Sequence, residues 1–274
     1  MLIVRWIVID MLQHGFMVRA LLVGSLIGIS AALLGPFLVL RRYAMIGDGL
    51  AHVSFASVSI ALLLGAQPLI FSIPLVILAS FGILRLSETA DVYGDAAIGL
   101  MSSFAVALGV LLASLGKGFS VDLYSYLFGS ILVIKQEEVW LTIGLTLIML
   151  VLIAAFYRDL FALTYDEEYA ITQKLPTRRL NYFISTLTAV TIVLGIRIVG
   201  TMLISSMIIF PAVTALQLAG SFRLTFVYSS VVALVSVVIG ISLSYIYNLP
   251  TGASIVLVNA VFFLLAFVIR RIRA

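Results

Sequence analysis

The stretch RRYAMIGDGLAHVSF, from Arg41 to Phe55, joins two long apolar segments and determines how they are connected. It places a carboxylate, Asp48, and an imidazole, His52, four residues apart in surroundings that are mostly hydrocarbon. If the stretch after Ile46 is helical, both side chains lie on one face, because positions i and i+4 are neighbours on a helix. An ionisable group inside a membrane is costly, so it usually faces a cavity or a partner and marks a pathway. The pair is therefore the first candidate for a functional site.

The composition of the chain predicts a membrane protein built from helices. Of its 274 residues, 63% are hydrophobic and 10% are charged, and the mean hydropathy is +1.26. Soluble domains do not have this composition. Apolar runs of about 18 or more residues recur along the chain, and each can cross roughly 30 Å of hydrocarbon as a helix. A transmembrane β-barrel would show short alternating segments instead. With no cysteine, the chain has no disulfide and no thiolate metal site.

We predict an all-α, polytopic membrane protein with about eight or nine transmembrane helices. The apolar part of 116–138 is too short to span, and it predicts an interfacial or re-entrant helix. Placing the charged stretch 158–179 in the cytoplasm puts Arg41, Arg42 and Arg85 on the same side, in agreement with the positive-inside rule. The predicted apolar segments are 16–40, 46–65, 68–86, 96–115, 139–157, 180–199, 200–220, 224–247 and 253–269.

Two interpretations of Asp48 and His52 remain open from their spacing. A divalent cation requires about four to six ligands, and a second copy of the chain around a two-fold axis would supply another carboxylate and imidazole. In the other interpretation, Asp48 caps the second helix and His52 bonds a backbone carbonyl. Counting residues places Asp48 near the inner surface, whereas a hairpin broken at Gly35-Pro36 and Gly47 would carry it deeper.

The sequence resembles a known family at four places along nearly its whole length. The run LVLRR (38–42) followed by MIGDGLAH (45–52) resembles the membrane permease subunits of ABC-type importers for zinc, manganese or iron(II). Three later stretches fit the same ABC-3 metal permease family in the expected order. They are DAAIG (95–99), RIVG (197–200) running on to FPA (210–212), and LPTGA (249–253).

The resemblance implies a single permease domain over 1–274, with the type II-like architecture of vitamin B12 and metal importers, in the inner cell membrane. It implies a homodimer that works with cytoplasmic ABC ATPase subunits and an extracytoplasmic metal-binding protein. Asp48 and His52 are then transient ligands of the transported ion, Zn²⁺ or Mn²⁺ with Fe²⁺ as a further candidate. The stretch between Gly116 and Ser130 looks closest to the zinc members, which ranks zinc first. No permanently bound cofactor is expected.

A docking segment is expected from Thr164 to Pro176. The sequence has no nucleotide-binding loop of the Gly-x-x-x-x-Gly-Lys-Ser/Thr type, so ATP would be hydrolysed on a partner subunit and this chain is not an enzyme. The acidic start and proline stop predict a short helix on the cytoplasmic surface. It resembles the coupling helix that fits a groove of the ATPase, although a solvated connector is the other interpretation. The expected coupling residues are Asp166, Glu167, Glu168, Tyr169, Ala170, Lys174 and Pro176.

Two residues depart from the family pattern. Lys174 stands where the family usually has glycine, so the turn that ends the docking helix is expected to differ. Asn248 stands where many relatives have aspartate, so an acidic group is missing from that position.

Four further residues are candidates for a pathway or gate: Asp95, Arg197, Ser205 and Pro211. For Asp95, capping of a helix N-terminus is favoured over contact with the metal. Ser205 and Pro211 fit helix packing as well as they fit a pathway, because small residues bring membrane helices together.

Three other classes of membrane protein are alternatives to the metal importer. A proton-coupled secondary transporter could use the same carboxylate and histidine, but it would not need a docking helix. An intramembrane metalloprotease is excluded, because the chain has two histidines and no His-Glu-x-x-His motif. Permeases for vitamin B12 or iron chelates share the expected architecture, but their bulky substrates do not explain Asp48 and His52.

Overall fold

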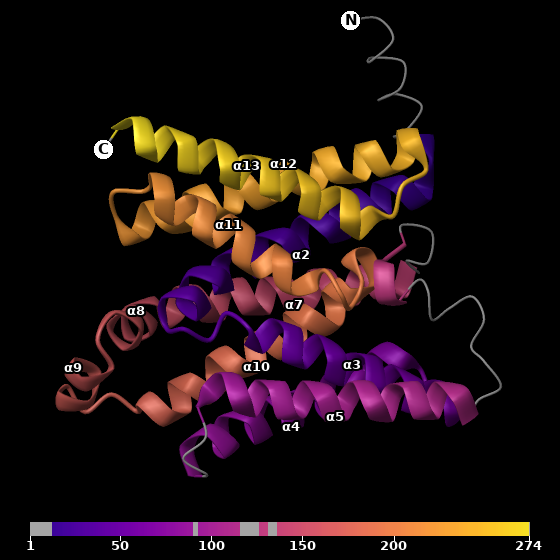
Figure 1. Ribbon diagram of the computed structural model, residues 1–274, viewed down its shortest axis with the longest axis horizontal. Helices are drawn as coiled ribbons and strands as arrows, with labels where there is room; N and C mark the ends of the chain where they lie inside the picture. The colour runs from indigo at the N-terminus through magenta and orange to yellow at the C-terminus, as the bar shows by residue number, and fades with distance from the viewer. Residues whose placement is uncertain (1–12, 90–92, 116–125, 131–135, 274) are drawn as a thin grey trace, which may run out of the picture.

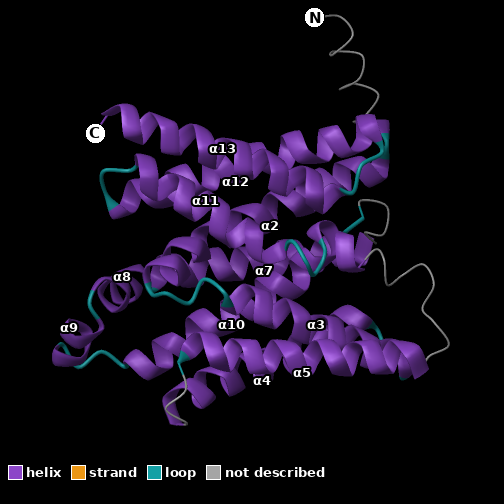
Figure 2. Cartoon of the chain, in the orientation of Figure 1, coloured by secondary structure: helices purple, strands orange, loops and turns teal. Residues whose placement is uncertain are grey.

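The computed structural model describes residues 13–89, 93–115, 126–130 and 136–273 (Figure 1). Every regular element in these residues is a helix (Figure 2). Within the described part, 8 helices are long and apolar enough to cross a membrane. The predicted all-α membrane fold is confirmed, whereas most of the predicted re-entrant segment lies outside the described residues. The eight helices are α2 (Gly15–Leu40), α3 (Ile46–Leu63), α4 (Pro68–Thr89), α5 (Gly94–Leu115), α7 (Gln136–Ala155), α10 (Thr177–Val199), α12 (Phe222–Tyr247) and α13 (Thr251–Arg273).

The predicted segment 200–220 forms a shorter helix than expected. Helix α11 (Ile204–Leu218) has 15 residues, which at 1.5 Å per residue gives about 22 Å, less than the hydrocarbon thickness. Gly200 takes a left-handed conformation with φ 88° and ends α10. The next amide, of Thr201, donates to the carbonyl oxygen of Tyr126 at 2.8 Å. Because the chain pairs with that segment first, α11 starts later and is too short to span alone.

The helices form three groups across the bundle (Figure 1). Helices α3, α4 and α5 lie on one side, α11, α12 and α13 lie on the other, and α2, α7 and α10 lie between them. Two short helices, α8 (Tyr157–Tyr165) and α9 (Glu167–Thr172), project at one end, which also holds the C-terminal end of α13. The charged stretch that was assigned to the cytoplasm therefore forms a distinct end of the molecule.

The connection between α2 and α3 turns back into the bundle (Figure 2). Helix α2 continues through Pro36 to Leu40, so the predicted break at Gly35-Pro36 is wrong. Gly35 instead permits a close approach to α11, because a Cβ atom there would lie 2.4 Å from the carbonyl oxygen of Ile208. Ile208 also lies 3.4 Å from the Cβ position of Gly47 in α3. Helices α2 and α3 thus both pack against Ile208 of α11, which places the first turn of α3, with Asp48, beside α11.

Candidate functional site

Asp48 and His52 lie on one face of α3, as the spacing predicts. The Nε2 atom of His52 is 3.6 Å from Oδ2 of Asp48. The N-cap residue of α3 is Met45, and Asp48 lies in the first turn of the helix. The alternative in which Asp48 caps the helix is therefore wrong. The carboxylate faces the imidazole.

The pair interrupts an otherwise buried part of α3. All residues from Ile46 to Ser59 except Asp48 and His52 are buried. The side chain of Asp48 is 32% exposed and that of His52 is 21% exposed. A carboxylate and an imidazole that are neither fully solvated nor covered by their own chain retain the capacity to bind an ion or a partner.

Two glycines explain why Asp48 lies between closely packed helices. A Cβ atom at Gly49 would lie 2.8 Å from Cγ2 of Ile98 in α5, and only glycine permits this approach without displacement. On the other side, the Cβ position of Gly47 is 3.4 Å from Cβ of Ser205 in α11. The sequence Gly-Asp-Gly therefore lets α5 and α11 approach α3 on both sides of the carboxylate.

One chain supplies too few ligands for a stable metal site. Among the described residues, no group of three or more His, Cys, Asp or Glu side chains could hold a metal ion. Asp48 and His52 offer one carboxylate and one imidazole, whereas a divalent cation requires about four to six donor atoms. Any ion at this pair would need donors from water, from backbone groups or from another chain.

Three further candidate residues, Ser205, Pro211 and Asp95, lie in the helices that pack against α3. Ser205 is buried and lies next to the first turn of α3, so the structure brings it close to Asp48. Pro211 is buried within α11. Asp95 is exposed and is the second residue of α5, so its predicted role as an N-cap is wrong. A carboxylate in the first turn is still favoured by the helix dipole, and Ile98, one turn later, makes the contact with α3.

Arg197 lies near the opposite end of α10 from the docking segment. Its Nη2 atom is 2.8 Å from Oε1 of Glu138 in α7, and the two side chains are 14% and 6% exposed. The guanidinium lies over the ring of Tyr126, 4.9 Å from its centroid. The backbone carbonyl of Arg197 accepts a hydrogen bond from the amide of Ser130. Arg197 is thus part of a closed, charge-compensated contact, and its partner Glu138 was not singled out from the sequence.

The predicted docking helix is divided at Asp166. Thr164 and Tyr165 end α8, and Pro176 is the N-cap residue of α10, so α9 covers only Glu167–Thr172 of the predicted 164–176. Asp166 is extended, with φ −154°, which separates the two helices. Its Oδ1 accepts a hydrogen bond of 2.9 Å from the amide of Tyr169 and caps α9.

One face of α9 packs and the other is free in this chain. Ala170 is fully buried, whereas Tyr169 and Ile171 of α9 are 55% and 58% exposed, and Tyr165 at the end of α8 is 82% exposed. Exposed apolar side chains on a short projecting helix are typical of a surface that binds another protein.

The two departures from the family pattern both occupy left-handed backbone positions. Lys174 has φ 56°, and the amide of Leu175 donates to the carbonyl of Ala170 at 3.1 Å. This is the common C-terminal turn of a helix, in which the left-handed residue is usually glycine. The turn is therefore retained, and Lys174 adopts a conformation that glycine favours. Asn248, with φ 52°, ends α12 in the same region, where asparagine is one of the tolerated residues.

An aromatic cluster attaches α8 to the bundle. Phe161 of α8 packs against Phe222 of α12 with ring centroids 4.8 Å apart. Phe226 in turn packs against Phe37 of α2 at 5.0 Å. Since α8 leads directly into α9, the docking segment is held close to the last turn of α2.

Comparison with known proteins agrees with this arrangement. The sequence profile of the ABC 3 transport family matches residues 13–270. The manganese transport system membrane protein MntC of Listeria innocua is 33% identical over 257 residues, covering 94% of this chain and 91% of MntC. The manganese import system permease protein ScaB of Streptococcus parasanguinis is 34% identical, with the same coverage of each chain.

Solved structures show the same fold. The structure of PsaBC from Streptococcus pneumoniae in complex with Fab contains a chain with a TM-score of 0.88 and 31% identity, covering 96% of this chain and 95% of that one. An inward-facing conformation of a putative metal-chelate type ABC transporter has a TM-score of 0.70 at 17% identity, covering 94% and 90%, which shows the fold alone. The chain therefore belongs to the ABC 3 transport family, as a multi-pass membrane permease of a metal importer and not an enzyme.

Proposed function

We propose that two copies of this chain form the translocation path of an ATP-driven importer for a transition-metal dication, with Asp48 and His52 of each copy as transient ligands. The observation that carries this proposal is that these two side chains are partly exposed on a helix whose neighbouring residues are buried. A second copy around a two-fold axis would double the ligands to two carboxylates and two imidazoles.

Manganese is the first candidate for the transported ion, and zinc is the second. Nitrogen and oxygen ligands suit both metals, so the Asp48 and His52 pair does not separate them. The residues from 116 to 130 ranked zinc first, but the names of MntC and ScaB are those of manganese transporters and support the reverse order. Four protein ligands would complete a tetrahedral zinc site, whereas an octahedral manganese site would retain water as well. Few protein ligands favour release of the ion.

Helix α9 is the proposed contact with a cytoplasmic ATPase. Tyr169 and Ile171 are exposed on a short helix that projects from the bundle, as expected for a helix that fits a groove. At the other end, an extracytoplasmic binding protein would deliver the ion. A proton-coupled transporter without an ATPase would leave the exposed face of α9 unexplained.

The test is metal uptake by proteoliposomes that contain the chain with its cognate ATPase and binding protein. Asp48→Asn and His52→Ala should each reduce uptake of manganese or zinc by about tenfold or more, because the first replaces a carboxylate with a neutral amide and the second removes an imidazole. Changes to groups that only support a metal ligand already have effects of this size. ATP hydrolysis should continue. His14→Ala and Glu88→Gln are matched controls, since His14 is the other histidine and Glu88 is paired with Arg178. Uptake that survives both site changes would make the pair structural, and uptake without the ATPase would favour the proton-coupled alternative.

A further inference from the structure

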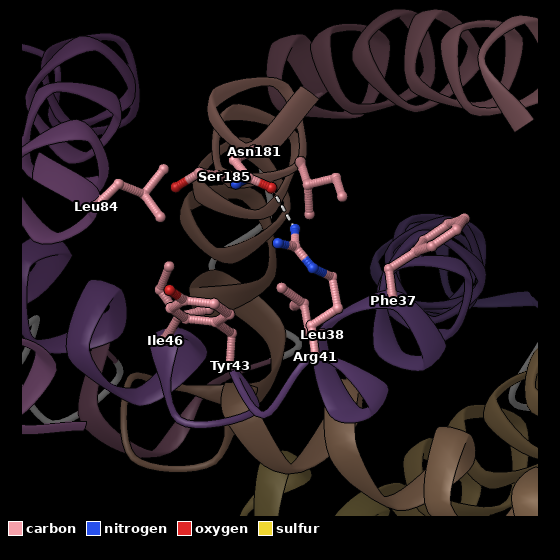
Figure 3. A pocket seen from close by; sticks show the side chains of 9 residues that line it. Phe37, Leu38, Arg41, Tyr43, Ile46, Leu84, Asn181 and Ser185 are labelled. Atoms are coloured by element: carbon pink, nitrogen blue, oxygen red, sulfur yellow. Dashed lines mark hydrogen bonds between the residues drawn. The ribbon is translucent and has the colours of Figure 1, made fainter. Parts of the chain in front are cut away.

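Arg41 joins three segments at the end of the bundle where α9 projects. Its Nη1 atom donates a hydrogen bond to Oδ1 of Asn181 in α10, as Figure 3 shows. Its Nη2 atom is 3.1 Å from Oε2 of Glu167, the first residue of α9. Nδ2 of Asn181 donates to the other oxygen of Glu167 at 3.3 Å. The three side chains close a ring between the end of α2, the docking helix and α10.

The carboxylate of Glu167 compensates the positive charge of Arg41. The Arg41 side chain is 10% exposed, whereas that of Glu167 is 48% exposed. A guanidinium that is largely removed from water requires a compensating negative charge, and loss of the partner leaves a buried charge uncompensated. The position of Arg41 is therefore tied to that of α9.

The path from Arg41 to the metal ligands is short and hydrogen-bonded. Arg41 is the C-cap residue of α2, and the amide of Tyr43 donates to the carbonyl of Leu38 at 2.9 Å. The amide of Ile46 donates to Tyr43 at 3.0 Å, and the amide of Asp48 donates to Met45 at 3.1 Å. Because these backbone hydrogen bonds hold the connection between α2 and α3 in one conformation, a displacement of Arg41 would also displace Asp48.

A narrow pocket leads from Arg41 toward Ser185. Arg41, Tyr43, Ile46 and Ser185 are among the residues that line it (Figure 3). Ser185 lies one helical turn after Asn181 in α10, and its side chain is 2% exposed. In the described part of the chain its hydroxyl oxygen has no hydrogen-bond partner. The hydroxyl can accept from a guanidinium that has moved one turn along α10.

We propose that Arg41 is the positioning residue that couples the docking helix to the metal ligands, by moving between Asn181 and Ser185 when α9 shifts. This inference rests on the proposed function, because it requires an ATPase that acts on α9. One-turn shifts of a side chain between two partners are an established form of switch. The movement would displace the first two turns of α3, which carry Asp48 and His52.

The test is a double-mutant cycle on the reconstituted importer. Arg41→Gln, Glu167→Gln and the double variant are compared for affinity toward the ATPase, ATP hydrolysis and metal taken up per ATP hydrolysed. With the ATPase at saturating concentration, we expect a loss in metal uptake per ATP on the order of tenfold in each single variant. The double variant should be no worse than the single ones, because both changes remove the same contact. Ser185→Ala should lower uptake per ATP while Arg41 and Glu167 remain paired.

Matched controls come from a second ion pair at the same end, between Arg178 and Glu88 at 3.2 Å. Arg178→Gln and Glu88→Gln should leave uptake per ATP unchanged. The inference would be overturned by unchanged uptake per ATP in Arg41→Gln and Glu167→Gln. It would also be overturned if the losses of the single variants multiplied in the double variant, or if the Arg178 and Glu88 variants showed an equal loss. Arg41→Gln leaves only the half-exposed Glu167 without its partner, so this variant should fold even if Glu167→Gln does not. A native chain without ATP-dependent uptake would instead overturn the proposed function.

Discussion

Two of the pairs that a carboxylate forms with a nitrogen-containing side chain are in very different states. Glu138 and Arg197 are 2.8 Å apart and almost fully buried. Asp48 and His52 are 3.6 Å apart, and 32% and 21% of their side chains are exposed. Burial requires the first pair to satisfy its own charges, and this holds α7 to α10. The second pair is free to engage other groups. Similar chemistry is thus closed at one place in the bundle and accessible at the other, where we propose that it binds the ion.

The largest expected effect breaks the closed pair. Glu138→Gln removes the charge that compensates Arg197 and should destabilise the protein by about 3–5 kcal/mol, the usual result of leaving a buried charge unpaired. Asp48→Asn should change stability far less, since its carboxylate is partly solvated. Thermal unfolding in detergent measures both. An equal loss in the two variants would mean that the pairs do not differ in the way their burial indicates.

A smaller effect identifies the open pair by its ligand. Manganese or zinc at about a hundred times its dissociation constant should stabilise the native protein by about 2.7 kcal/mol. Asp48→Asn and His52→Ala should abolish this shift in the unfolding temperature. Glu138→Gln should retain the metal-induced shift, although its unfolding temperature without metal should be lower. A metal-induced shift that persists in Asp48→Asn and His52→Ala would place the ion elsewhere.

Packing beside the open pair can be tested with Gly49→Ala. The added methyl group would meet Ile98 at 2.8 Å and push α3 away from α5. We expect a loss of about 1–3 kcal/mol, as for other overpacked sites, together with weaker metal binding. Gly82→Ala is a suitable control, because its nearest contact is the flexible end of Met101 at 3.4 Å. Equal losses in the two variants would argue against a special role for the α3–α5 contact.

The smallest effect concerns the docking end, away from both pairs. Lys174→Gly should stabilise the turn after α9 by about 1 kcal/mol, because the left-handed conformation suits glycine. Chemical denaturation of the detergent-solubilised chain measures this gain. Gly220→Ala, at a position without close contacts, is a reference for an ordinary substitution. A loss of stability in Lys174→Gly would show that the lysine side chain contributes more than its backbone conformation costs.

The sequence predicted most helices because their apolar lengths match the membrane, and it predicted the meeting of Asp48 and His52 because a helix fixes their spacing. It did not predict the contacts of Arg41, since Glu167 and Asn181 lie 126 and 140 residues away in the chain. Glu138 was overlooked because it stands in an acidic helix start, which resembles a surface feature. The division of the docking segment depends on the extended backbone of Asp166, which the acidic run concealed.

The placement of Asp48 between Gly47 and Gly49 has a consequence for how such transporters can diversify. The packing of α3 against α5 and α11 rests on the glycines, whereas the side chain at position 48 projects into the open region between those contacts. If Asp48 and His52 bind the transported ion as proposed, substitutions at 48 and 52 would alter the donor atoms and leave the glycine contacts intact. Descendants of one ancestral permease would then acquire a preference for a different cargo in one or two mutational steps, provided that the flanking glycines are inherited unchanged.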